Sequence, residues 1–272
     1  MNAPLQAAWA AVDWARAGEI IRHTGAGWDE AEVQAFAGML EKVHGTARYG
    51  TAGSKKQTLT RRSLVLMEAS VSIAVFLDKR DIYDKSIERF KRSTAQYIYM
   101  KSDKPYPLLP QGITRAKLLS HWWNGQKEFK EDGMAMEVCR DLTHTGYGLA
   151  SISHVAETAR IQGLDLYKQD VGKRLLAGLE FQARYDKRGG AEKVPAWLCK
   201  GQLKLALEDV TEPAFSRLAN KDNMPFTKKL TMAARPARAN TLFVGLETLT
   251  HAQDVLTTQQ NKVKSPWSFW RR

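Results

Sequence analysis

The sequence has few cysteines and no long hydrophobic run, the features that mark disulfide-rich, zinc-binding and membrane-spanning proteins. Only two of its 272 residues are cysteines, Cys139 and Cys199, and they are far apart and show no CxxC or other metal-ligand spacing. This argues against a disulfide framework and against a zinc site, so we expect two free, buried thiols. No hydrophobic run reaches transmembrane length. Charged residues interrupt the apolar N-terminus at helical intervals, which indicates an amphipathic helix rather than a signal peptide.

Acidic residues are also scarce relative to basic ones. Lys and Arg total 41 against 29 Asp and Glu, which gives a formal charge of +12. A surface of this charge attracts polyanions such as nucleic acid, anionic lipid or an acidic polysaccharide. The basic residues are dispersed and no known nucleic-acid-binding motif is present. We therefore expect neither nucleic acid nor a membrane as a partner.

Strand signals are scarce, whereas helical periodicity runs through most of the chain. With 43% hydrophobic residues, the chain can bury the core of one domain covering residues 1–272. We predict an all-α chain of antiparallel helical hairpins. The expected helices are 5–22, 29–43, 61–78, 80–100, 135–162, 169–185, 203–210 and 239–259, with loops at 44–58, 120–129 and 188–197 and a basic aromatic tail at 260–272.

One stretch, "MEVCRDLTHTGYG" at residues 136–148, crowds ionisable groups together. Residues three or four apart share a face of a helix. The side chains expected on one face are Glu137, Arg140 or Asp141, His144 and Tyr147. Such a polar stripe could serve a reaction, and a purely structural ion-pair network is the equal competing interpretation. We expect His154, further along, to be structural.

Four segments, in order along the chain, resemble the alginate-lyase-domain proteins. They are "IAVFLDKRDIYDKSIERF", "MEVCRDLTHTGYGLASISHVAETARIQGLDLY", "VPAWLC" and "GLETLTHA". The closest branch is polysaccharide lyase family 38, and the similarity runs from about Ala8 to Ala252. The resemblance implies an (α/α) toroid or incomplete barrel whose inner helices line a groove for an anionic glycan. It also implies a secreted or periplasmic location, and that this chain begins inside the family's N-terminal region.

The resemblance further implies β-elimination on a 4-linked polyuronate, alginate or glucuronan. A cation neutralises the carboxylate, a base removes the C5 proton and an acid protonates the leaving oxygen, without a metal or organic cofactor. His144 would be the base or the carboxylate neutraliser, and Arg140 the neutraliser or an orienting group. Tyr185 would be the acid, with Tyr147 as a competitor on spacing grounds.

The expected substrate-binding residues come from several segments of the chain. They are Glu137, Asp141, Trp122, Trp123, Asn124, Arg61, Arg235 and Arg238. The two tryptophans would stack on sugar rings, unless they close a loop over the core. The arginines near the C-terminus match the family there and would hold carboxylates, with a solvated basic loop as the competing interpretation.

The sequence departs from the family pattern at two places. Arg61 and Arg62 stand where related sequences carry an Asn-Trp pair, and Met136 stands where glutamine is usual. If that asparagine neutralises the carboxylate, Arg61 could replace it by charge, but its longer side chain would place the cation differently. The alternative function is therefore a catalytically impaired protein of the same fold that binds acidic glycan.

Overall fold

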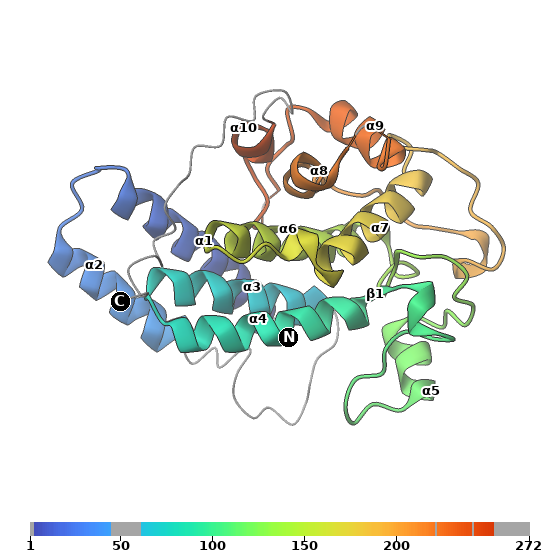
Figure 1. Ribbon diagram of the computed structural model, residues 1–272, viewed down its shortest axis with the longest axis horizontal. Coiled ribbons are helices and arrows are strands. Elements are labelled where there is room, and N and C mark those ends of the chain that lie inside the picture. Colours follow the sequence, from blue (N-terminus) through green and yellow to red (C-terminus); the bar gives the residue numbers. More distant parts are fainter. Residues whose placement is uncertain (1–2, 45–60, 221, 241, 253–272) are drawn as a thin grey trace.

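The computed structural model describes residues 3–44, 61–220, 222–240 and 242–252 (Figure 1). Most of the predicted loop at 44–58, the end of the predicted helix at 239–259 and the tail at 260–272 lie outside these ranges. Helices predominate in the described part, where the strands are limited to β1 (Ile98–Tyr99) and β2 (Met134–Ala135), paired antiparallel. The all-α prediction is confirmed for this part of the chain.

The long helices form hairpins around α3. They are α1 (Ala3–His23), α2 (Glu30–Met39), α3 (Arg61–Phe76), α4 (Arg80–Tyr97), α6 (Leu142–Ile161) and α7 (Asp170–Tyr185). Helix α3 packs against α1, α4 and α6, and α6 pairs with α7 (Figure 1). The shorter helices are α5 (Arg115–Lys117), α8 (Glu212–Leu218), α9 (Pro225–Ala234) and α10 (Glu247–His251), with π turns at Leu40–His44 and Leu118–Trp122 and 3-10 turns at Lys101–Asp103, Leu166–Lys168 and Cys199–Gly201.

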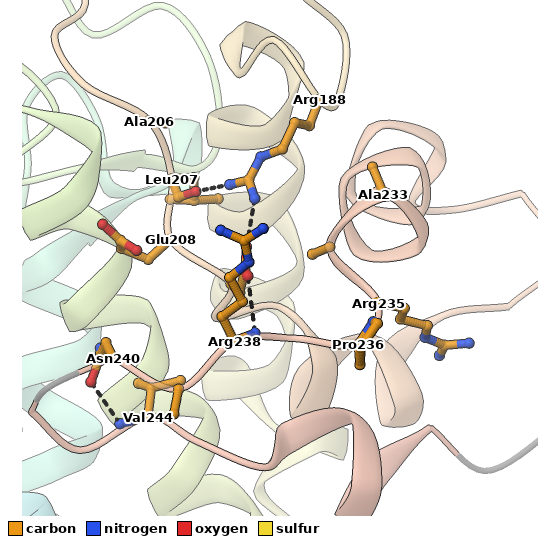
Figure 2. Close-up of a pocket in the computed structure, with 13 residues that line it drawn as sticks. Arg188, Ala206, Leu207, Glu208, Ala233, Arg235, Pro236, Arg238, Asn240 and Val244 are labelled. Atoms are coloured by element: carbon orange, nitrogen blue, oxygen red, sulfur yellow. Dashed lines mark hydrogen bonds and ion pairs between the residues drawn. The ribbon is translucent and has the colours of Figure 1, made fainter.

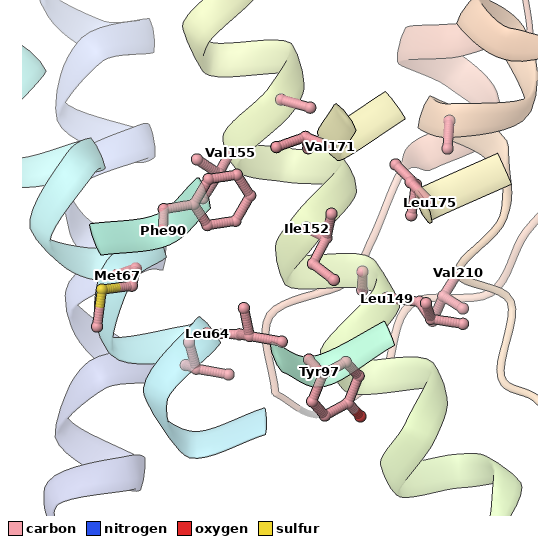
Figure 3. Close-up of a cluster of buried hydrophobic side chains, with 14 of the residues drawn as sticks. Leu64, Met67, Phe90, Tyr97, Leu149, Ile152, Val155, Val171, Leu175 and Val210 are labelled. Atoms are coloured by element: carbon pink, nitrogen blue, oxygen red, sulfur yellow. The ribbon is translucent and has the colours of Figure 1, made fainter. Parts of the chain in front are cut away.

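Helix α6 lies in the middle of the core. Its side chains Leu149, Ile152 and Val155 are almost completely buried among residues of neighbouring helices (Figure 3). Burying a side chain of this size contributes about 1.5–3 kcal/mol. A Cβ at Gly148 would lie 2.3 Å from the Tyr97 hydroxyl oxygen, so only glycine lets that phenol approach α6.

The start of α6 corrects the prediction of a helix over 135–162. The helix begins at Leu142 because Asp141, with φ −175°, caps it: its carboxylate accepts a hydrogen bond of 2.7 Å from the backbone N–H of His144. Glu137 and Arg140 therefore lie in the turn before the helix and not on its face.

Two other segments differ from the predicted pattern. Residues 203–210 are not helical: Leu205 has φ +59° and the Leu207 N–H donates to the Asp186 carboxylate at 2.7 Å. These bonds to distant residues replace the local bonds that a helix would make. Of the predicted helix at 239–259, only α10 forms within the described residues. The unpredicted helices α8 and α9 both have proline in the first turn, a recognisable start signal.

The two cysteines form a disulfide, Cys139–Cys199, so the expectation of free thiols was wrong. The partners are 60 residues apart in sequence, and the α6–α7 hairpin between them brings them together. Gln126 joins the same place: its side chain accepts from the Cys199 N–H at 3.0 Å and donates to the Trp197 carbonyl at 2.9 Å. The turn that precedes α6 is thereby fastened to the loop that follows α7.

A row of charged side chains, buried except for the partly exposed Arg16, ties four helices together. The His154 ring on α6 lies 2.7 Å from Glu68 Oε1 on α3 and 2.8 Å from Glu247 Oε1 on α10. Arg16 on α1 donates to the same Glu68 oxygen at 2.6 Å. Burial and Arg16 lower the pKa of His154, but Glu68 and Glu247 raise it more strongly, and the net effect raises the pKa to about 9. His154 is therefore an imidazolium at neutral pH.

We predict that the disulfide stabilises the fold by about 4 kcal/mol, because it closes a long loop of the unfolded chain. Adding dithiothreitol, or replacing both cysteines with serine, should lower the free energy of unfolding measured with urea by this amount. The double-serine variant should not respond to the reductant. A wild-type transition that is the same with and without reductant would contradict the disulfide.

We predict that stability falls as the pH rises through 9. The pKa of His154 is raised from 6.5 to about 9 by folding, so its contribution is complete below pH 6.5 and is lost above pH 9, about 3 kcal/mol in all. Urea unfolding between pH 6.5 and 10 measures it. The fall should be absent in His154→Gln and unchanged in His23→Gln, whose side chain is 65% exposed. A flat wild-type profile would refute a charged His154.

Candidate functional site

The candidate site lies at one end of the α6–α7 hairpin. Because the two helices are antiparallel neighbours, the first turn of α6 and the last turn of α7 meet there. Residues 203–209 cross this end: the Leu142 N–H donates to the Lys204 carbonyl at 2.9 Å. The Thr143 hydroxyl donates to the Ala206 carbonyl, also at 2.9 Å. His144 and the segment 203–209 are thus held at the same end of the molecule.

Four polar side chains form a continuous chain of contacts, which we call the polar chain: Asp141, His144, Arg140 and Glu137. His144 Nδ1 lies 2.6 Å from an Asp141 carboxylate oxygen, and its Nε2 lies 2.9 Å from an Arg140 nitrogen. Arg140 also donates to Glu137 at 2.9 Å. A guanidinium can only donate, so Nε2 accepts and Nδ1 carries the proton that is donated to Asp141. Asp141 therefore sets the tautomer of His144 that leaves Nε2 basic.

Exposure separates the roles within the polar chain. The side chains of Arg140 and His144 are 41% and 25% exposed, whereas those of Asp141 and Glu137 are 10% and 3% exposed. Glu137 and Asp141 are thus engaged with Arg140 and His144, and the expectation that they bind substrate stays a prediction. Their contacts hold Arg140 and His144 in place. The sequence does contain a signal for this arrangement, because Asp141 is a typical N-cap residue directly before an apolar helical run.

The two candidate tyrosines lie in different surroundings. The Tyr147 ring is 6.1 Å from the His144 ring, centroid to centroid. The Tyr185 hydroxyl accepts a hydrogen bond of 3.0 Å from Arg184. Burial raises the pKa of Tyr185, and Arg184 offsets this only in part. Tyr147, whose ring contacts the His144 ring, is the phenol that the structure brings to the imidazole.

A cavity of about 750 Å³ lies beside the segment 203–209 (Figure 2). Arg188 is fixed in its wall by Asp186 and Asp209. Figure 2 shows the side chains of Arg188 and Arg238 pointing toward one another, whereas that of Arg235 points away.

Arg188 is already paired with two carboxylates, so of these two arginines it is the exposed Arg238 whose guanidinium the cavity offers to an anion. Arg235 instead forms an ion pair with Glu212 at 2.6 Å, so its expected role in binding is not supported by its geometry. Sequence reasoning missed Arg188, Glu208 and Asp209. The last two fell within a predicted helix, where their side chains had no reason to meet a distant arginine.

The tryptophan pair divides between core and surface. Trp123 is completely buried, and its ring packs edge-on against Phe129 at 4.9 Å. It cannot stack on a sugar, and the interpretation that it closes the loop over the core holds. Trp122 is half-buried, and Asn124 is exposed at φ +51° in the predicted Asn-Gly turn. The side chain of Arg61 lies outside the described residues.

No protein-family model, curated protein or solved structure matches this chain. Within the described ranges, no helix is both long and apolar enough to cross a membrane. In the same ranges, no three His, Cys, Asp or Glu side chains are grouped to hold a metal ion. The site is therefore interpreted from its own geometry: an oriented imidazole beside a guanidinium and a phenol, near an arginine-bearing cavity.

We predict that Asp141→Ala lowers the free energy of unfolding by about 1 kcal/mol, because α6 loses its N-cap. Asp141→Asn should lower the free energy of unfolding much less, since asparagine caps a helix about as well as aspartate. Urea unfolding of the two variants beside the wild type measures the difference. Equal losses in both would mean that the charge of Asp141, and not its capping oxygen, supports the start of α6.

Proposed function

We propose that this protein is a polysaccharide lyase that cleaves a 4-linked acidic polyuronate, alginate or glucuronan, by β-elimination. The observation that carries the proposal is the polar chain, in which Asp141 holds His144 in the basic tautomer and Arg140 stands at its Nε2. The reaction needs a base for the C5 proton and a cation for the adjacent carboxylate. These two groups are neighbours here, and both are partly exposed.

The described contacts support a definite sequence of steps. Arg140 gains more from two charge-assisted bonds to a substrate carboxylate than from one bond to a neutral imidazole. We propose that it turns to the carboxylate and leaves His144 Nε2 to take the C5 proton. The electron pair of that C–H bond forms the C4–C5 double bond as the C4–O bond breaks. Tyr147, next to His144, gives its proton to the leaving oxygen.

Charge and architecture support an acidic polymer as the substrate. The chain carries a formal charge of +12, and Arg188 and Arg238 converge on a cavity of a volume usual for small-molecule sites. We propose that the helical hairpins form an incomplete (α/α) barrel and that the cavity belongs to its groove. The disulfide suits an oxidising compartment, which favours a secreted or periplasmic protein.

One observation favours the second candidate, a catalytically impaired protein that binds acidic glycan. His144 Nε2, the atom that must take the proton, is engaged by Arg140. Met136, at a departure from the family pattern, is 1% exposed and belongs to the core. If Arg140 keeps its contact with His144 when glycan binds, the protein binds the polymer without cleaving it.

We predict that the wild type produces the ultraviolet absorbance of an unsaturated uronate when mixed with alginate or glucuronan. His144→Ala should lower the rate by about 10²- to 10⁴-fold, because the base is lost, while calorimetry shows that the polymer still binds. His23→Ala, at an exposed position, is the matched control and should keep the wild-type rate.

The outcomes separate the two candidates. Binding by the wild type without any new absorbance supports the impaired binder. Full activity in the His144→Ala variant would show that His144 is not the catalytic base. Neither binding nor cleavage of any polyuronate would refute both candidates.

A further inference from the structure

Residues 242–251, which we call the strap, lie over the continuation of the site along α6. Phe243 is 5% exposed, and its ring stacks on the Trp9 ring of α1 at 5.9 Å with an interplanar angle of 18°. Its other neighbours meet it edge-on: Tyr147 at 6.1 Å and His154 at 5.7 Å. One aromatic ring of the strap thus fills a space walled by three rings of the helical core.

The residues beneath the strap continue the stripe that begins at His144. Tyr147, Ser151 and His154 follow it at helical intervals and so share one side of α6. The His144 end of this stripe is partly exposed, and the strap covers the rest through Phe243 and Glu247. The covered surface is therefore a direct extension of the candidate site.

This covered surface holds polar atoms that the strap does not satisfy. Among the described residues, Trp9 Nε1, Ser151 Oγ and Glu68 Oε2 are buried and have no hydrogen-bond partner. Their residues are 6%, 0% and 1% exposed. Buried polar groups in native proteins are nearly always hydrogen-bonded, because leaving one unpaired costs free energy. Trp9 stacks on Phe243, Ser151 lies between Tyr147 and His154 along α6, and Glu68 contacts His154, so these unpaired atoms border the covered surface and suit a polar ligand better than they suit a phenyl ring.

The outer side of the strap makes few contacts. Leu246 is in the left-handed region at φ +58° and is 66% exposed, and Leu249 is 80% exposed. Helix α10 has only five residues. On the inner side, Val244 also lines the cavity that holds Arg238, so the cavity ends where the strap begins. Movement of the strap would join the cavity and the covered surface into one groove.

We infer that the strap covers a sugar-binding subsite on α1 and α6, in which Phe243 occupies the place of a pyranose ring on Trp9. The inference rests on the proposed function and extends its site. The C–H face of a sugar ring packs on an indole as a phenyl ring does. Its hydroxyl groups would also pair with the three unsatisfied atoms, which Phe243 cannot do. Binding of a polyuronate chain therefore displaces the strap.

The first test removes the ring that occupies the subsite. Phe243→Ala should lower the Kd for alginate or glucuronan oligosaccharides about tenfold, because the subsite is then open. Leu249→Ala, on the exposed side of the strap, is the matched control and should bind as the wild type does. A folded Phe243→Ala that binds no more tightly than the wild type overturns the inference.

The second test needs no variant and decides the matter if Phe243→Ala does not fold. Saturating the wild type with the same oligosaccharides should speed hydrogen exchange at the amides of residues 242–251, with those of α4 as the internal control. Unchanged or slower exchange overturns the inference while cleavage by the wild type still stands. If the wild type neither binds nor cleaves any of these oligosaccharides, the proposed function and the inference fall together.

Discussion

The buried cation at His154, paired with Glu68 of α3, is the interaction on which the packing of α6 among the long helices depends. A charge in the interior is tolerated only when its partners are placed well enough to repay the loss of hydration. Here the partners come from α3 and α10, with Arg16 of α1 on the same carboxylate. The constraint fixes the rotation of α6 about its own axis. Because His144 lies on the same side of that helix, its direction follows from a contact almost three turns away.

The sequence predicts the long helices well, and for a simple reason. Their apolar residues recur at helical intervals, and that pattern depends only on near neighbours along the chain. The start of α6 was misplaced by seven residues, because the apolar Met136 and Val138 continue the pattern across a turn. The segment 203–210 has a helical composition but not a helical fold. Its hydrogen bonds go to Asp186 and to the start of α6, partners that no local pattern reveals.

The candidate site divides in the same way. His144, Arg140 and Tyr147 lie within eight residues of sequence, so their grouping could be predicted from spacing, even though the helix begins later than expected. The cavity could not be predicted, because Arg188 and Arg238 come from separate segments that meet only after folding. The surface beneath the strap could not be predicted from the sequence either. The residues facing it come from α1, α3, α6 and the strap.

The Cys139–Cys199 bond turns the α6–α7 hairpin into a covalently closed ring of polypeptide. A protease that cuts one peptide bond inside this ring does not release either product, since the sulfur bridge still joins them. The two halves of a nicked chain would also stay in register, because the turn before α6 and the loop after α7 share one anchor. Through this one bond the protein would survive a break in its central helical pair.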